Sequence, residues 1–145
     1  MADMSPEDWA FWETWMRAHR LLAGELDRGL QRDCGISKAE FSVLRTLRHP
    51  MRVGELADEL AWEKSRVAHL LTRMEKRGLV TRTEAGAGGR RTGIELTAEG
   101  HRLAARATRA HGANVRQHVL DRLTPDQAAA IQSWSEELIE RVGQV

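Results

Sequence analysis

Apolar residues recur at helical spacing along most of the chain, and polar signals mark where the segments begin and end. Ser5-Pro6-Glu7-Asp8 places a capping serine, a proline and two acids at a helix start. Apolar residues and one histidine then keep one helical register as far as Gly35, where we expect the helix to stop. These positions are Trp12, Trp15, Met16, His19, Leu22, Leu26 and Leu30. The pattern predicts one long N-terminal helix.

A second helix begins at a capping box. Ser37 and Glu40 have the spacing in which each side chain satisfies a backbone N–H of the other residue. The helix must end by His49, because Pro50 disfavours α geometry in the residue before it. Its inward face is expected to hold Phe41, Leu44 and Leu47.

Two further helices follow closely. Residues 53–60 have the pattern of a short helix, although Arg52 is a poor N-cap. Residues 64–77 form a longer helix, and Gly78 suits a left-handed C-cap. The longer helix is expected to bury Val67, Leu70, Leu71 and Met74.

The period then changes from helical to alternating. Residues 79–83 and 92–96 alternate like strands, and the glycine-rich segment 85–91 joins them as a basic hairpin tip. Thr97 can cap a fifth helix that runs to about Leu120. The sequence Thr124-Pro125-Asp126-Gln127 opens a sixth, with Ile131, Trp134, Leu138 and Val142 among its apolar positions. The predicted fold is mainly α (α+β), in the order α-α-α-α-β-β-α-α.

A short helix, a tight turn, a second helix and a basic hairpin form the layout of a winged helix-turn-helix. An α-helix about 10–12 Å across fits the major groove of DNA, and the hairpin can reach phosphates or the minor groove. The outward side chains of the second helix include Ser65, Arg66, His69 and Arg73. Arginine can donate two hydrogen bonds to guanine, and serine or histidine can contact bases or phosphate.

Charge divides along the chain in the same way. Residues 64–91 carry eight Lys or Arg and two Glu, a net charge of +6, whereas residues 1–33 and 119–145 each carry −3. A basic middle between acidic ends suggests a surface that faces a polyanion, and the alternative is an ordinary solvated helix. The single cysteine, the lack of a signal-like start and the lack of an apolar run of about 18 residues favour a cytoplasmic protein.

Several segments together resemble the MarR (multiple antibiotic resistance regulator) family. They are Val53–Ala57, Glu63–Val67, Leu71–Val80 and Arg90–Gly100. The order and lengths of the helices match as well, so the resemblance covers essentially the whole chain.

The resemblance implies a homodimeric transcriptional repressor that binds pseudo-palindromic operator DNA. Residues 1–36 and 98–145 would be dimerisation helices, and residues 37–97 the DNA-binding lobe. The residues toward DNA would be Lys64, Ser65, Arg66, His69, Arg73, Arg90 and Arg91. A small aromatic or phenolic effector would bind between the lobes, against Trp12, Trp15 and His19.

Two positions depart from the family pattern. The family usually has an aspartate two residues before the wing arginine, where this chain has Gly88, so Arg91 is expected to share the role of Arg90. Ala68-His69 stands where relatives often have Ser or Thr followed by Arg. The operator preference of relatives therefore does not transfer.

Other conspicuous residues have two interpretations each. Cys34 could sense peroxide, but an inert thiol is favoured because no sequence feature marks the thiol as reactive. His111 and His118 lie about 10.5 Å apart along one helix, too far to share a metal ion, so no metal or cofactor is expected.

The tryptophans at the N-terminus could line an effector site or pack in a dimer interface, and packing is favoured. Trp62 is expected to anchor the helix that follows it.

No nucleophile, metal-hydrolase or nucleotide-binding motif is present, so an enzyme is not expected. The alternative to a DNA-binding regulator is a winged-helix module that binds protein, which would not need the charge of +6.

Overall fold

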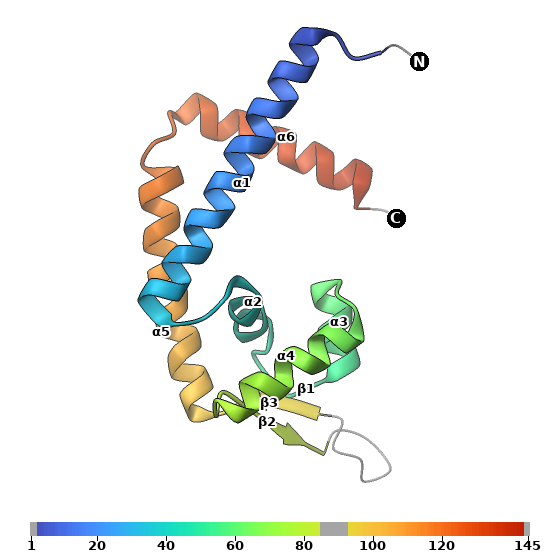
Figure 1. Cartoon of the computed structure of the whole chain (residues 1–145), viewed down its shortest axis with the longest axis vertical. Coiled ribbons are helices and arrows are strands. Elements are labelled where there is room, and N and C mark those ends of the chain that lie inside the picture. Colours follow the sequence, from blue (N-terminus) through green and yellow to red (C-terminus); the bar gives the residue numbers. More distant parts are fainter. Residues whose placement is uncertain (1–2, 85–92, 144–145) are drawn as a thin grey trace. The chain divides into compact units, whose positions relative to one another are not determined.

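Figure 1 shows the helices and strands of the computed structural model, which describes residues 3–84 and 93–143. The chain divides into two units, Met1–His111 and Gly112–Val145. In chain order the elements are α1 (Pro6–Cys34), α2 (Lys38–Thr46), β1 (Met51–Arg52), α3 (Val53–Leu60), α4 (Lys64–Lys76), β2 (Val80–Thr83), β3 (Gly93–Leu96), α5 (Ala98–Val115), the π-helical turn η1 (Arg116–Leu120) and α6 (Pro125–Val142). The predicted winged helix-turn-helix fold is confirmed.

Helices begin where their capping residues predict. Complete capping boxes open α1 at Ser5, α2 at Ser37 and α6 at Thr124. Thr97 caps α5, because its hydroxyl oxygen accepts a hydrogen bond of 3.0 Å from the Gly100 N–H. Each cap satisfies an N–H group that the first turn of a helix leaves without a partner.

The two central helices both end in a Schellman motif. After α4, Gly78 has φ +73°, and the Leu79 N–H donates to the Met74 carbonyl at 3.0 Å. After α3, Ala61 occupies the equivalent left-handed position with φ 54°, and the Trp62 N–H donates to the Ala57 carbonyl at 3.0 Å. Left-handed backbone costs a non-glycine residue about 1–2 kcal/mol. The left-handed conformation of Ala61 was not predicted, because the turn contains no glycine.

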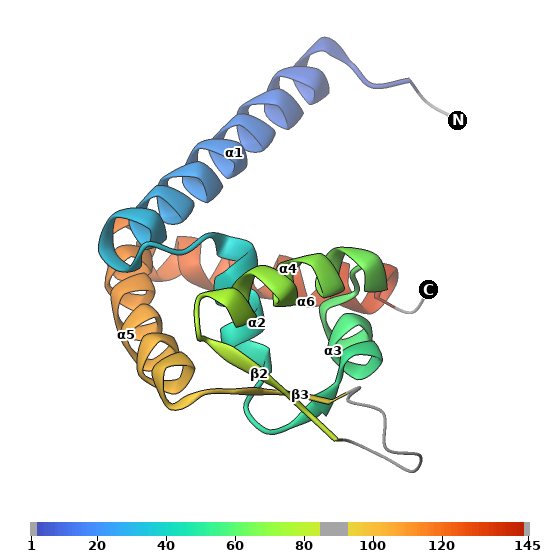
Figure 2. The same cartoon turned by 60° about the horizontal axis from the view of Figure 1, so that its bottom comes forward.

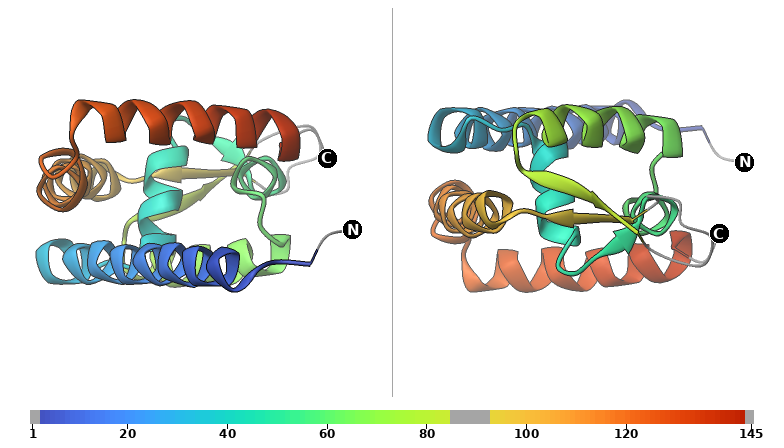
Figure 3. Two further views of the ribbon diagram at one scale, coloured as in Figure 1. Left: turned by 90° about the horizontal axis from the view of Figure 1, so that it is seen from above. Right: turned by 90° about the horizontal axis from the view of Figure 1, so that it is seen from below.

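Among the described residues the sheet has three strands, in the order β1-β3-β2, rather than the two predicted. Met51 pairs with Ile94 and Val80 pairs with Leu96, both in antiparallel register. A strand of two residues is too short to produce an alternating pattern, so the first strand was missed. Figure 3 shows α2 crossing the direction of β2 and β3 while α4 runs alongside them.

One apolar core joins these elements within the first unit. Val43 of α2, Leu56 of α3, Leu71 of α4 and Ile94 of β3 are all completely buried. The start of α5 packs directly on backbone, since a Cβ added at Gly100 would lie 2.0 Å from the Leu79 carbonyl oxygen. The core therefore fixes α4 relative to the sheet and to α2 and α3.

The second unit contains the end of α5, η1 and α6. The fifth helix was predicted to continue to about Leu120, but its α-helical hydrogen bonding ends at Val115 and a single π turn follows. Among the described residues of α6 none is buried, although the helix carries Ile131, Trp134, Leu138 and Val142.

Candidate nucleic-acid interface

The outer face of α4 carries the side chains that the sequence analysis assigned to DNA. Val67, Leu70, Leu71 and Met74 are buried, which turns the opposite face of the helix to solvent. The exposed residues of that face include Lys64, Ser65, Arg66, His69 and Arg73. The predicted separation of the two faces is confirmed, and contact with DNA remains a prediction for each residue.

Basic residues of this region fall into two groups. Arg77 pairs with Glu40 and also donates to the Gly35 carbonyl at 3.1 Å, and Arg82 lies 3.7 Å from the Glu75 carboxylate. Within residues 3–84 and 93–143, by contrast, no carboxylate pairs with Lys64, Arg66, Arg73 or Lys76. The cations on the outer part of α4 therefore keep their charge available for an external anion.

The first turns of α3 and α4 differ from those of the other described α-helices. The residues at their N-cap positions, Arg52 and Glu63, make no side-chain capping hydrogen bond. The N–H groups of these turns are left to water or to a ligand. Backbone N–H groups at a helix N-terminus suit phosphate, because the helix dipole favours negative charge there.

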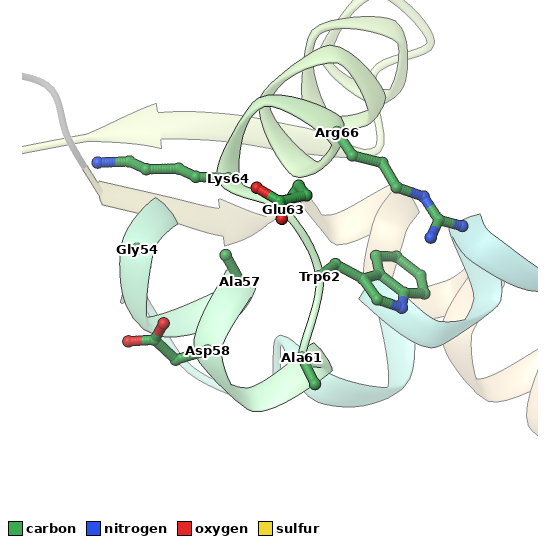
Figure 4. A pocket seen from close by; sticks show the side chains of 8 residues that line it. All are labelled: Gly54, Ala57, Asp58, Ala61, Trp62, Glu63, Lys64 and Arg66. Carbon is green, nitrogen blue, oxygen red and sulfur yellow. The ribbon is translucent and has the colours of Figure 1, made fainter.

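An open hollow of about 560 Å³ lies between α3 and the start of α4 (Figure 4). Its lining residues are Gly54, Ala57, Asp58, Ala61, Trp62, Glu63, Lys64 and Arg66. Arg66 reaches back over the indole ring of Trp62, with the guanidinium carbon 4.3 Å from the ring centroid. Trp62 is partly buried and packs against the core, which confirms the expectation that it anchors the helix. The stacking of Arg66 on this ring was not predicted.

The wing is described at its base. Figure 2 shows β2 and β3 side by side, with β3 leading into α5. Arg90 and Arg91, like Gly88, lie outside the described residues. Thr97 joins the base of the wing to the end of α4, since its hydroxyl donates to the Gly78 carbonyl at 2.6 Å.

A second hollow, of about 470 Å³, lies between α2 and α5. Its apolar lining comes from Leu44, Ala104 and Ala105, and its basic lining from Arg45, Arg48 and Arg109. Near this helix pair the ring of His111 contacts Phe41, with ring centroids 4.9 Å apart. Burial lowers the pKa of His111 below 6.5, and the positive charges of Arg45 and Lys38 lower the pKa further. The neutral imidazole is therefore favoured here.

The predicted effector residues lie on the exposed part of α1. Trp12 and Trp15 contact each other with ring centroids 5.6 Å apart, and His19 is also exposed. Cys34, at the end of the same helix, belongs to the buried core. Among residues 3–84 and 93–143 no three His, Cys, Asp or Glu side chains form a group that could hold a metal ion. No described helix is both long and apolar enough to cross a membrane.

These features define the class of protein: a winged helix-turn-helix whose second helix, α4, turns a basic face to solvent. Residues 35–91 match the model of the MarR family. The chain is 32% identical over 94 residues to the transcriptional regulator HosA of Escherichia coli O157:H7. The matched residues make up 63% of this chain and 69% of HosA.

Two solved structures from Streptomyces coelicolor are similar over nearly the whole chain. One is AbsC, a MarR family transcriptional regulator, with 28% identity, a TM-score of 0.84, and 99% of this chain and 100% of AbsC covered. The other is Sco3205, a MarR family transcriptional regulator in complex with DNA, with 32% identity and a TM-score of 0.85. The similarity covers 98% of this chain and 91% of Sco3205. The chain belongs to the MarR family of DNA-binding transcriptional regulators. Members of this family are regulators, which confirms the expectation of a regulator rather than an enzyme.

Proposed function

We propose that the protein is a homodimeric repressor that reads a pseudo-palindromic operator with α4 in the major groove. The observation that carries the proposal is the division of charge on α4. Arg77 pairs with Glu40 beside the α1–α2 junction, whereas the cations on the outer part of the helix have no carboxylate partner among the described residues. A surface whose positive charges are not neutralised by neighbouring carboxylates of the described residues suits the phosphates and base edges of DNA.

Within this proposal the side chains have separate tasks. Arg66 lies in the first turn of α4, where a side chain can reach a base edge and donate two hydrogen bonds to guanine. The uncapped first turns of α3 and α4 suit phosphates, as do Lys64 and Arg73. Arg90 and Arg91 of the wing, which lie outside the described residues, would contact phosphate or the minor groove.

The tasks can be separated with two variants. Arg66→Ala should cost about 1–3 kcal/mol on the preferred operator and much less on scrambled DNA, because it removes a base contact. Combined Arg90→Ala and Arg91→Ala should weaken both duplexes and make the salt dependence shallower by about one unit of log–log slope per lost phosphate contact. Binding isotherms at several salt concentrations, on an operator selected from a random DNA pool, provide the measurement.

Arg102→Ala is a matched control, because this exposed arginine of α5 pairs with Glu99 of its own helix at 2.8 Å. It should change neither affinity nor salt slope. The assignment of tasks is reversed if the wing variant loses only specificity while Arg66→Ala weakens all DNA equally. A wild-type protein without affinity for any duplex would instead favour the protein-binding alternative.

The proposal of a dimer rests on apolar side chains that are exposed in the single chain. Phe11 of α1 is 72% exposed, and Trp9 and Trp12 of the same helix are exposed as well. In α6, Ile131, Ile139 and Val142 are all more than 50% exposed. Folded proteins rarely leave large apolar patches open to water, and a second copy with the same faces can cover them. Residues 1–36 and 98–145 would therefore form the interface, and residues 37–97 the DNA-binding lobe.

Deletion of residues 124–145 should leave an aggregated or unfolded product. The reason is that the apolar residues of α1 and α5 would lose part of the dimer interface that buries them. A milder test is Ile131→Glu with Trp134→Glu, compared with Gln132→Glu in the same helix. Sedimentation equilibrium should give two chains for wild type and for the control, and a smaller or aggregated species for the double variant. A well-folded monomer that binds DNA after the deletion would contradict the dimer proposal.

Release by a small effector is the remaining part of the proposal. The hollow between α2 and α5 combines an apolar lining with Arg45, Arg48 and Arg109, which suits a small aromatic anion. The exposed rings of Trp12 and Trp15, with His19, would close such a site in the assembled dimer. A fold neighbour of 17% identity, the organohalide-sensing regulator RdhR-CbdbA1625, has 2,4-dichlorophenol bound in its structure.

A ligand that binds the DNA-incompetent shape more tightly should lower operator affinity by shifting the population. We expect at least one compound in a panel of aromatic acids and phenols to do so, and Arg109→Ala to reduce that response. Operator affinity measured across the panel is the test. A panel that never changes the affinity rules out effector release and leaves the DNA-binding proposal intact.

A further inference from the structure

The turn between α3 and α4 holds an aromatic ring in a fixed place. The backbone N–H of Trp62 donates to the Ala57 carbonyl at 3.0 Å. Ala61, with its left-handed backbone, directs the chain out of α3 just before Trp62. The indole is partly buried and packs against the apolar core. Trp62 is therefore attached to the lobe through both its backbone and its side chain.

Arg66 uses this ring as a platform. Its guanidinium carbon lies 4.3 Å from the ring centroid, within the distance of a cation–π contact (Figure 4). A guanidinium that stacks on an aromatic ring can keep the N–H groups at its edge free to donate. No carboxylate pairs with Arg66 in the part of the chain that the structure describes.

We propose that Trp62 is a positioning residue that holds the Arg66 guanidinium in place before DNA arrives. The inference rests on the proposed function, in which Arg66 reads a base. A free arginine loses rotamer freedom when it forms two hydrogen bonds to guanine, and a stacked arginine has already lost part of it. Trp62 therefore contributes to operator specificity through Arg66, without a base contact of its own.

The ring also limits where Arg66 can reach. Figure 4 shows Arg66 and Lys64 extending to opposite sides of the α4 N-terminus. Lys64 has neither a carboxylate nor a ring partner among the described residues, so it is free to follow a phosphate. Of these two side chains, Arg66 has its direction set by the contact with Trp62, and a defined direction is what base readout requires.

A double-mutant cycle tests the coupling. Trp62→Leu should weaken binding to an operator duplex selected from a random pool by about two- to tenfold, and change binding to a scrambled duplex by less than twofold. Trp62→Phe keeps a ring face and should stay within about twofold of wild type. In an Arg66→Ala background Trp62→Leu should cause no further loss. Arg73, exposed on the same helix, provides the matched control, because Trp62→Leu should have its full effect in an Arg73→Ala background.

Equal losses from Trp62→Leu with and without Arg66 would overturn the proposal, since Trp62 would then act on DNA directly or through the fold alone. Failure of the proposed function has a different signature: the wild-type protein would bind operator and scrambled duplexes equally.

A second measurement holds even if Trp62→Leu does not fold. In the NMR spectrum of the free wild-type protein, ring current should shift the Arg66 Nε–H resonance upfield of the other arginines. The resonance is assigned by its loss in Arg66→Lys. An unshifted Arg66 resonance would show that the contact does not persist in solution, and would overturn the proposal.

Discussion

Four side chains on one face of α4, Val67, Leu70, Leu71 and Met74, are at most 3% exposed, and the rest of the winged helix-turn-helix depends on their burial. Burying an aliphatic side chain of this size contributes about 1.5–3 kcal/mol, so rotating the helix would be costly. A helix that cannot rotate has a fixed outer face. The direction of Arg66, His69 and Arg73 is therefore decided by the apolar residues of the opposite, buried face.

Both ends of α4 are held as well. At the start, the Schellman turn of α3 fixes Trp62, and Trp62 supports Arg66. At the end, Arg77 binds Glu40 of α2 and the carbonyl of Gly35, the residue that ends α1. The Lys38 N–H donates to Asp27 of α1 at 2.8 Å and strengthens the same junction. Helix α4 is thus linked to the end of the long N-terminal helix by polar contacts in addition to the core.

Local signals made most of the fold predictable from sequence. Capping boxes at Ser5, Ser37 and Thr124 mark helix starts by chemistry confined to four residues, and the structure reproduces them. The two faces of α4 follow from helical period alone. Features that depend on distant partners were missed. Strand β1 exists only because Met51 meets Ile94, and the left-handed Ala61 is tolerated because the surrounding turn and core enforce it.

The candidate site likewise contains features that the local sequence predicts and features that depend on other parts of the chain. Sequence placed Lys64, Ser65, Arg66, His69 and Arg73 on the outer face, because burial of the opposite face requires it. Sequence did not distinguish paired from unpaired cations, since Arg77 meets Glu40 across 37 positions of chain. The stacking of Arg66 on Trp62 was missed for a related reason: the two residues lie on either side of a helix start, where helical spacing does not apply.

We propose that a symmetric pair of α4 helices reads DNA through the major groove, and methylation interference distinguishes this arrangement from minor-groove or single-site binding. Dimethyl sulfate methylates guanine N7 in the major groove and adenine N3 in the minor groove, so one experiment compares the two grooves. Guanine methylation should block binding at two symmetry-related positions about one helical turn, or 10–10.5 base pairs, apart. Interference at adenine N3 alone, or in a single half-site, would contradict it.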